Sequence, residues 1–513
     1  MRVRPATVNA IVACQRGTDV RVSSAQHIAQ LVTGAGAQAS VIGDGQVRVG
    51  PDVVIDTRLA SRGSLFIGLP GERVDGADLA GDAAERGAAA AILGHDTQAP
   101  LTRILVPDAA AALARLARAL VDEEIGRGMT TFAITGSSGK TSTKDLLAQV
   151  LEQAGPTVSP TGNHNNEIGV PLTACRVDEN TRFLVAEMGA RGIGHIRQLC
   201  EVVPPRVAAV LNVGTAHLGE FGSQDAIARA KGEILEALPA DGWAVLNDDD
   251  EQVADMGGRT VARVARWSVT GQPTRDAELA VWAEDISLDA LQRGSFGLHA
   301  VRQGVHGRVG VSLGLIGAHQ VPNAVAAATM ALAAGLPLTG VGEALSGARV
   351  RSPLRMELVE GPGGAAIIND CYNANPDSMA VALRTVAAMG RARRAEIPGA
   401  RLVAIIGDMA ELGQDATGLH EAAGALAASL GYDEIIAIGE YARSIVDGAR
   451  AAGGPPGTGS TAGANARVAG KEDAAESLEL GPGDVVLVKA SRVLALEDVT
   501  ARLIGHDEEG TAR

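Results

Sequence analysis

Residues 131–145, TFAITGSSGKTSTKD, decide the fold of this chain, because they join a β-rich run, a tight polar turn and the start of a helix. Small residues let the turn fold tightly, so that its N–H groups and the positive end of the helix point at phosphate oxygens. Lys140 would reach the β- and γ-phosphates, and Thr141 would ligate Mg²⁺. The usual pattern G-x-x-x-x-G-K-[ST] needs glycine where this chain has Ile134, and its first glycine is Gly136. We therefore predict a shortened nucleotide phosphate loop rather than an ordinary turn with a surface lysine.

The composition indicates a globular protein of several domains. At 513 residues the chain is too long for one core, and its length suggests about three domains. Aromatic residues make up only 2%, so Val, Leu, Ile and Ala must build the cores. No apolar run reaches the roughly 18 residues that span a bilayer, and the N-terminal stretch lacks a secretory signal pattern. We expect a cytoplasmic protein with no membrane span, and a monomer by default.

Charge and cysteine spacing exclude several classes. A net charge of −15 disfavours a nucleic-acid partner, since phosphate backbones bind to basic faces. An anionic small substrate is still compatible, through a few arginines and helix N-termini. The cysteines Cys14, Cys175, Cys200 and Cys371 show no C-x-x-C spacing, which argues against a metal knot or a disulfide frame. We expect them to be small buried hydrophobes.

The pattern along the chain predicts an α/β protein of three domains. Residues 1–125 alternate short β-like runs with Ala-rich helical stretches, as in a small α/β domain. Residues 126–350 form a central parallel-sheet domain of the P-loop type, with a β-rich insertion at about 260–315. Residues 351–513 repeat βα units as a Rossmann-like domain, and the lack of G-x-G-x-x-G argues against a dinucleotide. The Gly/Ser/Pro-rich stretch 451–466 is predicted to be a flexible surface loop.

Polar side chains close three predicted strands of the middle domain, at the edge where open parallel sheets place their ligands. These side chains are Glu187, then Asn212 and His217, then residues 247–250, NDDD. A carboxylate at such a position suits Mg²⁺, which prefers hard oxygen ligands. Taken alone, His217 is better explained as a satisfied loop histidine, and Lys231 as a solvated helix lysine.

Two loops offer groups that could bind a polar substrate. The amide-rich loop 161–173, TGNHNNEIGVPLT, must order something polar. In the first domain, Asp56, Thr57 and Arg58, with residues 71–76, offer hydroxyl and guanidinium groups suited to a diphosphate or a carboxylate. Spacing alone fits turn and surface residues equally well.

Nine strings along nearly the whole chain resemble the ATP-dependent Mur ligases, in the order of that family. They are TGSSGKTSTKD, TGNHNNEIGVPLT, AEMGARGIGHI, NVGTAHLGEFGS, AKGEI, GAHQVPNAVAAA, NDCYNANPDSM, GDMAELG and VLVKASR. The shortened phosphate loop is typical of the same family. The strings NHNNE, YNANP and GDMAELG are similar to those of the member that adds D-alanyl-D-alanine to the UDP-N-acetylmuramoyl-tripeptide.

The resemblance implies a three-domain amide ligase of peptidoglycan precursor synthesis. The first domain would bind the UDP-sugar end, the middle domain ATP, and the third would close over both. ATP would phosphorylate the terminal carboxylate of the tripeptide, and the amine of D-alanyl-D-alanine would attack the acyl phosphate. Two Mg²⁺ ions would offset the repulsion between a carboxylate and a triphosphate.

The resemblance also implies a role for individual residues. The nucleotide would contact Gly136, Ser137, Ser138, Gly139, Lys140, Thr141, Ser142, Asn323, Arg355, Asp370, Tyr372 and Asn375. Within that set, Asn323 would contact adenine, Arg355 the γ-phosphate and Asp370 the ribose. The metal ions would involve Thr141, Glu187, His217 and a CO₂-carbamylated Lys231, and catalysis would depend on Lys140, His217, Lys231 and Arg355. Substrates would contact Asp56, Thr57, Arg58, Asn163, His164, Asn165, Asn166, Lys489 and Ser491.

Two alternatives remain to be weighed. A sister ligase acting on another amino acid or on folate would share the phosphate loop, but the Asp-Asn-Pro-Arg string expected of a diaminopimelate ligase is absent from this sequence. A binding or scaffold protein that had lost catalysis would be expected to lack at least one of the residues assigned to it. Asp145 departs from the usual glutamate, and Asn369 and Cys371 also differ from the family pattern, all three as tolerated neighbours.

Overall fold

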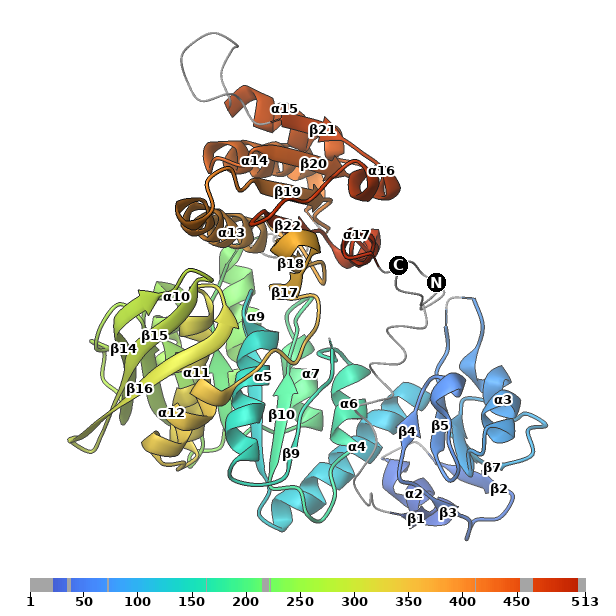
Figure 1. Ribbon diagram of the computed structural model, residues 1–513. Coiled ribbons are helices and arrows are strands. Elements are labelled where there is room, and N and C mark those ends of the chain that lie inside the picture. The colour runs from blue at the N-terminus through green and yellow to red at the C-terminus, as the bar shows by residue number, and fades with distance from the viewer. Residues whose placement is uncertain are drawn as a thin grey trace.

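The computed structural model describes residues 22–34, 38–71, 73–162, 164–214, 221, 223–410, 412–452 and 465–505. Three α/β units follow one another along the chain, each built around its own main sheet (Figure 1). The sheets are mostly parallel, so the predicted fold class is confirmed. Within the described ranges, no helix has the length and apolar character needed to cross a bilayer.

The first unit contains a five-stranded sheet in the order β2-β7-β6-β5-β4. Its strands are β2 (Ser40–Ile42), β4 (Val53–Val54), β5 (Leu65–Gly68), β6 (Ala90–Leu93) and β7 (Thr102–Leu105), and its helices are α2 (Ala25–Val32) and α3 (Ala80–Glu85). The short strands β1 (Ser23–Ser24) and β3 (Arg48–Val49) pair separately. The long helix α4 (Ala109–Gly126) then leads to the phosphate loop.

The middle unit contains a nine-stranded sheet in the order β16-β15-β14-β13-β12-β11-β8-β10-β9. Its strands are β8 (Thr130–Thr135), β9 (Thr157–Val158), β10 (Phe183–Glu187), β11 (Val207–Val210), β12 (Trp243–Asn247), β13 (Arg263–Ser268), β14 (Leu279–Leu288), β15 (Arg293–Arg302) and β16 (Val305–Ile316). Its helices are α5 (Lys140–Glu152), α6 (Gly169–Ala174), α7 (His195–Val202), α9 (Gln224–Glu236), α10 (Glu251–Ala254), α11 (Gln320–Ala333) and α12 (Leu338–Gly347). Strands β14 to β16 pair antiparallel and extend the sheet, so the predicted β-rich insertion is part of it.

The core of the middle unit includes one apolar face of α5. Leu146, Leu147, Val150 and Leu151 are all buried in one cluster with the apolar side of α11. Burying such side chains stabilises the fold by about 1.5–3 kcal/mol each. All three tryptophans of the chain, Trp243, Trp267 and Trp282, lie on adjacent strands of this sheet and are buried.

The third unit contains a six-stranded sheet in the order β17-β18-β22-β19-β20-β21. Its strands are β17 (Glu357–Glu360), β18 (Ala366–Asp370), β19 (Leu402–Gly407), β20 (Glu434–Ile438), β21 (Asn465–Val468) and β22 (Val485–Lys489). Its helices are α13 (Pro376–Glu396), α14 (Ala416–Ser429), α15 (Ala442–Ala452), α16 (Lys471–Glu476) and α17 (Glu497–Leu503). Five strands run parallel, which confirms the repeated βα units predicted from sequence.

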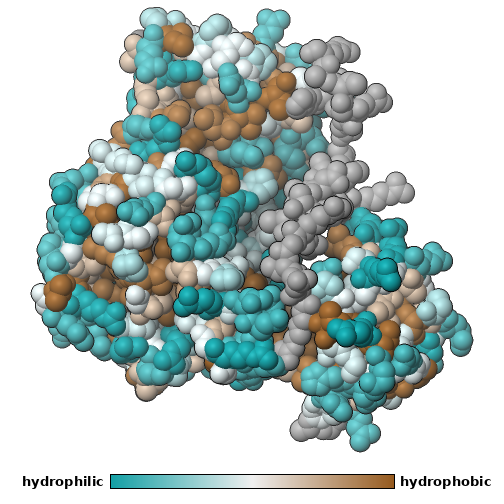
Figure 2. All heavy atoms as spheres, turned by 60° about the horizontal axis from the view of Figure 1, so that its bottom comes forward, coloured by the Kyte–Doolittle hydropathy of each residue, from teal (hydrophilic) through white to brown (hydrophobic). Residues whose placement is uncertain are grey.

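The third unit packs on the middle unit, above it in Figure 1. Ile316 at the end of β16 shares an apolar cluster with Met356 and Ile368 of the third unit. In the face shown in Figure 2, hydrophilic and hydrophobic residues are interspersed over the atoms that are coloured by hydropathy. The carboxyl ends of the middle strands therefore lie beside the third unit, and the candidate site forms there.

Candidate active site

The turn of residues 136–139 joins β8 directly to α5, and its last residue must be glycine. Gly139 has a φ of +79°, which L side chains rarely adopt. A Cβ at this position would also stand 2.6 Å from Oδ1 of Asn323. The N–H groups of this turn and of the first turn of α5 form a cradle of the kind that binds phosphate.

Asn212, just after β11, braces this loop from the side. Its Oδ1 accepts hydrogen bonds from the backbone N–H groups of Ser137 at 2.9 Å and Ser138 at 3.0 Å. The next residues continue the brace, because the N–H of Gly214 donates to Oγ of Ser137 at 2.9 Å. The loop after β11 therefore fixes the shape of the phosphate loop.

Lys140 folds back over the loop that precedes it. Its Nζ donates to the carbonyl oxygen of Gly136 at 2.6 Å. Burial lowers the pKa of Lys140, while the charge of Glu187 acts in the opposite direction. The ammonium group thus lies at the mouth of the cradle, where a phosphate would replace the carbonyl as its partner.

Glu187, the last residue of β10, is a buried carboxylate held by neutral groups. Its Oε2 accepts from Oγ1 of Thr141 at 2.9 Å, and its Oε1 accepts from Nδ2 of Asn165 at 3.0 Å. Only 1% of Glu187 and 4% of Thr141 is exposed. The described residues place no cation in contact with this carboxylate, and a buried charge needs a partner. A hydroxyl, an amide and a carboxylate are hard oxygen donors, so the set fits Mg²⁺.

Lys231 lies on α9 and is buried, with 5% exposed. No hydrogen bond from its ammonium is found within the described ranges. Burial lowers the pKa of Lys231 well below its usual 10.5, and the charge of Lys140 adds to this effect. Two residues further on, Glu233 accepts from the N–H groups of Gly194 at 2.6 Å and Arg197 at 3.1 Å, which ties α9 to the start of α7.

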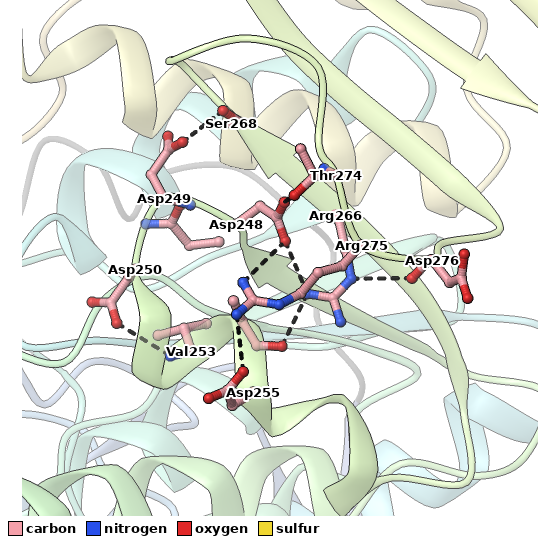
Figure 3. A network of polar contacts seen from close by, with 12 residues as sticks. Asp248, Asp249, Asp250, Val253, Asp255, Arg266, Ser268, Thr274, Arg275 and Asp276 are labelled. Atoms are coloured by element: carbon pink, nitrogen blue, oxygen red, sulfur yellow. Dashed lines mark hydrogen bonds and ion pairs between the residues drawn. The ribbon is translucent and has the colours of Figure 1, made fainter.

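The three aspartates after β12 belong to a network of polar contacts with neighbouring segments (Figure 3). Asp248 pairs with Arg266 of β13 at 3.1 Å, and Asp249 accepts from Oγ of Ser268 at 2.6 Å. Asp250 accepts from the N–H of Val213 at 2.8 Å, next to the brace formed by Asn212. These carboxylates are therefore committed to structural partners.

The start of α11 forms the wall opposite α5. Nδ2 of Asn323 donates to Oε1 of Gln320 at 3.1 Å, and Asn323 Oδ1 accepts from Oγ1 of Thr143 at 3.4 Å. His319, the residue before the helix, is close enough to the third unit to sense Asp370, although burial is the main cause that lowers its pKa. Polar groups of α5, α11 and the third unit thus meet beside the phosphate loop.

Arg355 reaches this place from the third unit. Its guanidinium carbon lies 4.1 Å from the centroid of the Tyr372 ring, a cation–π contact. Its charge contributes to lowering the pKa of Lys140, so the two cations are near one another. The neighbours Leu354 and Met356 have φ values of 62° and 47°, which are strained for non-glycine residues. An anion between Lys140 and Arg355 would relieve the repulsion of the two cations.

Asp370 is bound on both oxygens at the end of β18. Oδ2 accepts from Nζ of Lys489 at 2.7 Å, and Oδ1 accepts from the N–H of Met356 at 3.1 Å. Lys489 is 1% exposed and also donates to the carbonyl of Asn373 at 2.9 Å. Asn375 caps α13 through a reciprocal capping box.

Comparison with known proteins identifies the family. UDP-N-acetylmuramoyl-tripeptide--D-alanyl-D-alanine ligase of Mycobacterium tuberculosis is 40% identical to this chain over an alignment 517 residues long. The alignment covers 95% of this chain and 98% of that protein. This chain belongs to the MurF group of the Mur ligase family. The Mur ligase middle domain matches residues 134–331, the glutamate ligase domain of Mur ligases residues 354–492, and the catalytic domain of the Mur ligase family residues 52–120.

Two MurF crystal structures share the fold over most of this chain. MurF from Acinetobacter baumannii matches with a TM-score of 0.79 and 27% identity, covering 95% of this chain and 100% of that one. MurF ligase from Thermotoga maritima, solved in complex with ADP, matches with a TM-score of 0.68 and 25% identity, covering 89% and 97%.

The Mur ligase residues predicted from sequence fall into two groups. The phosphate loop, Glu187, Asn165, Asn323, Arg355 and Tyr372 meet at one edge of the middle sheet, through the contacts given above. In the same loop as Asn165, Asn166 caps α6 through the N–H of Gly169 at 2.8 Å, and His164 is exposed. Ser142 lines a hollow beside Arg355, and Ser491 is buried at the end of β22.

The predicted group in the first unit makes a local contact instead. Arg58 donates to Asp56 with its guanidinium at 2.5 Å, and Asp56 accepts from the backbone N–H of Arg58 at 2.9 Å. The hydrogen bond from Arg58 lowers the pKa of Asp56. Thr57 begins a short 3₁₀ helix between them. The hydrogen bonds and the ion pair between Asp56 and Arg58 therefore lie within the first unit of this Mur ligase.

Some predicted residues lie outside the described ranges. They are His217, Asn163, Cys14 and most of the stretch 451–466. Cys175, Cys200 and Cys371 are buried and free, as expected, and burial raises the pKa of Cys175 to about 12.

Sequence reasoning missed the residues that support this Mur ligase site. Asn212 was placed at a strand end but given no role, and Asp145 was treated as a tolerated neighbour. In the structure, Asp145 pairs with Lys144 at 2.7 Å and accepts from Oγ of Ser352 at 2.6 Å. The departure of Asp145 from the usual glutamate was the only signal in the sequence that pointed to it.

Proposed function

We propose that this protein is an ATP-dependent ligase that joins D-alanyl-D-alanine to UDP-N-acetylmuramoyl-tripeptide in peptidoglycan precursor synthesis. The observation that carries the proposal is the phosphate loop with Glu187, Lys231 and Arg355 gathered around it, in a chain that matches a ligase of that name along 95% of its length. Since the reaction consumes ATP, we place it in the cytoplasm.

ATP would bind with its phosphates in the cradle of residues Gly136, Ser137, Ser138, Gly139, Lys140, Thr141 and Ser142. The N–H groups at the end of the turn and in the first turn of α5 would donate to the β-phosphate oxygens, and Lys140 would exchange the carbonyl of Gly136 for the β- and γ-phosphates. The ADP in the Thermotoga maritima structure supports a nucleotide in this fold.

Mg²⁺ would be held by Thr141 and Glu187, with phosphate oxygens and His217 completing two sites. When bound, it would shield the charge of the phosphates from the approaching carboxylate. Oγ1 of Thr141 and Oε2 of Glu187 already lie 2.9 Å apart, so both oxygens can turn toward one ion.

Lys231 would supply a further oxygen ligand after reaction with CO₂. Because burial lowers its pKa, Lys231 loses its proton more readily than a lysine in water, and the neutral amine can attack CO₂, forming a carbamate and releasing one proton. The product is an anion, which suits a position beside metal ions better than an ammonium does.

The nucleotide base and ribose would lie between α5, α11 and the third unit. Asn323 would contact adenine. Asp370 would bind the ribose hydroxyls after giving up one of its present hydrogen bonds, from Met356 or from Lys489. Tyr372 and Asn375 would shape the pocket, and Arg355 would bind the γ-phosphate. A base in this position would touch both units, which links nucleotide binding to their closure.

The peptide substrates would approach from the two outer units. Asp56, Thr57 and Arg58 would contact the UDP-sugar, and Asn163, His164, Asn165 and Asn166 the region of the reacting carboxylate. Lys489 would act through Asp370, which it already binds, and Ser491 would face D-alanyl-D-alanine. We propose domain limits of 1–125, 126–350 and 351–513, supported by the three separate main sheets.

In the reaction, an oxygen of the tripeptide carboxylate attacks the γ-phosphorus and ADP leaves, which gives an acyl phosphate. Lys140 and Arg355 would stabilise the charge that develops on the transferred phosphoryl group. The amine of D-alanyl-D-alanine then attacks the acyl carbon, loses a proton, and phosphate leaves as the amide forms. The described residues therefore supply positioning and positive charge rather than a nucleophile.

Phosphate release from ATP tests the proposal. Purified protein is given UDP-N-acetylmuramoyl-tripeptide with and without D-alanyl-D-alanine, beside a Lys140→Ala variant. We expect release that depends on the dipeptide and is lost in the variant. Release only with another amino acid or with folate would assign the chain to a sister ligase, and no release with any of them would favour a binding protein.

A further inference from the structure

The segment 349–352, between α12 and β17, is fastened along α5, the helix that begins at the phosphate loop. In Figure 1 this gold segment crosses α5 on its way to the third unit. Oε1 of Gln149 accepts from the N–H of Arg349 at 2.9 Å, and its Nε2 donates to the carbonyl of Arg349 at 3.0 Å. Ser352 Oγ donates to Oδ2 of Asp145 at 2.6 Å, and Arg351 forks onto Glu152, at 2.6 Å for the first of its two bonds. We call these three contacts the clasp.

The clasp uses one face of one helix. Asp145, Gln149 and Glu152 are spaced by four and three residues, so their side chains lie in a row along α5. The same helix opens with Lys140 and Thr141, and the fastened segment ends three residues before Arg355. The clasp therefore connects the helix that begins with Lys140 to the segment that leads to Arg355, the two cationic groups of the site.

The three contacts differ in strength. Arg351 and Glu152 are exposed, and such pairs contribute little. Asp145 is 9% and Ser352 6% exposed, so their hydrogen bond is shielded from water. Gln149 satisfies both backbone groups of Arg349, as a neighbouring strand would. Asp145 and Gln149 thus provide most of the attachment.

Beyond the clasp, the chain is fixed from the other side. The carbonyl of Leu354 accepts from the N–H of Tyr372 at 3.0 Å, and the N–H of Met356 donates to Asp370. Leu354 and Met356 have positive φ values, which persist only where surrounding contacts impose them. Arg355 therefore lies between one anchor on α5 and another on β18.

We propose that Asp145 and Gln149 are positioning residues for Arg355. By holding residues 349–352 on α5, they fix the guanidinium at a set distance from Lys140, so that the γ-phosphate meets both cations at once. This inference rests on the proposed function. Small errors in the placement of a catalytic group cost large factors in rate, so the clasp acts on turnover rather than on substrate recognition.

Kinetics of matched variants test the clasp. Gln149→Ala removes both bonds to Arg349, and Gln153→Ala changes the same residue type one turn further on, where it is exposed. Ser352→Ala removes the buried bond, and Ser352→Thr keeps the hydroxyl. We expect kcat to fall roughly 10-fold or more in the two Ala variants of the clasp, the loss of about one to two hydrogen bonds. KM for D-alanyl-D-alanine and Tm should stay near wild type, with Ser352→Thr restoring kcat and Gln153→Ala unchanged.

The rate of trypsin cleavage after Arg349 and Arg351 measures how firmly residues 349–352 are held on α5, and it does not depend on ligase activity. The segment should be cut faster in Gln149→Ala than in Gln153→Ala and the wild type. Equal cleavage rates, or an unchanged kcat in both clasp variants, would overturn the proposal. A wild-type protein that forms no amide bond but shows the difference in cleavage would instead reject the proposed function and leave the attachment standing.

Discussion

Lys231 shows how burial alone can change the chemistry of one side chain. A lysine in water is an ammonium, but this one is 5% exposed and its pKa lies well below the usual value. The charge of Lys140 nearby lowers it further. The neutral amine is the form that reacts with CO₂, so the same burial that costs stability prepares the group for the role proposed here.

The buried amine makes stability depend on pH. Between the lowered pKa and 10.5 the unfolded chain binds a proton at Lys231 that the folded chain does not, so stability rises with pH. Denaturant unfolding from pH 7 to 10 in CO₂-free buffer, compared with Lys231→Met, should show this. The wild type should gain up to about 1.4 kcal/mol per pH unit relative to the variant. Parallel pH profiles would show that Lys231 is protonated in the folded protein.

Gly139 combines a backbone requirement with a steric one, and the two can be separated. Gly139→Ala and Gly128→Ala both place a Cβ at positive φ, at a cost of roughly 1–2 kcal/mol. Only at Gly139 would that Cβ meet another residue, Oδ1 of Asn323, whereas Gly128 faces open space. Both variants should lose stability, and Gly139→Ala alone should raise KM for ATP, by roughly 10-fold or more if the loop shifts. Equal KM values in the two variants would contradict this.

At the scale of elements, the site depends on how α9 is fixed. Glu233 is 2% exposed and binds two N–H groups at the start of α7, where a negative charge is also favoured by the helix dipole. We call this contact of Glu233 the cap of α7. Because Lys231 lies on α9 with Glu233, the cap fixes the position of Lys231 relative to Glu187.

Loss of the cap should therefore affect stability and activity together. Glu233→Ala leaves buried N–H groups without a partner and should lower the free energy of unfolding by about 1–3 kcal/mol. Glu201→Ala on exposed α7 surface is the control. Denaturant titration measures the first effect and phosphate release the second. Equal free energies of unfolding and equal rates of phosphate release in Glu233→Ala and Glu201→Ala would contradict this prediction.

Elements were easier to predict than their partners. The glycines and the apolar period of α5 are local patterns, so the phosphate loop and its helix could be predicted from residues 131–151 alone. Asp145 and Ser352 are separated by 207 positions, and nothing in either neighbourhood marks the pair. The acidic run 248–250 was well placed for a metal, but its partners Arg266 and Ser268 come from the next strand. The roles of Lys231 and Asp370 were predicted from the resemblance to the Mur ligases, because the spacing of residues in the sequence does not indicate them.

At the scale of the molecule, the third unit closes directly on the phosphate loop. A Cβ on Gly214 would stand 3.2 Å from Oδ2 of Asp377 in α13 and 3.3 Å from Cβ of Ser137. The start of α13 therefore lies against the same loop that Asn212 braces. Contact between the third unit and the phosphate loop is thus already made without a nucleotide.

A larger side chain at Gly214 should act as a wedge. Gly214→Leu should raise the radius of gyration in X-ray scattering and lower ligase activity, with unchanged circular dichroism. Gly310→Leu, on an exposed strand with no atom within 4 Å, is the control. An unchanged radius of gyration in Gly214→Leu would show that the two units are not held at this point.

The placement of the tryptophans lets spectroscopy distinguish the middle unit from the other two. Trp243, Trp267 and Trp282 all belong to the middle sheet, and the other two units contain none. Arg263 lies 4.3 Å from the ring of Trp243, and Trp282 stacks on His299, so two of the indoles report on contacts between neighbouring strands. Tryptophan emission, excited selectively over tyrosine, therefore follows the melting of the middle sheet alone, while far-ultraviolet signal sums over all three units. A gap between the two melting curves measures directly how cooperatively the outer units unfold with the centre.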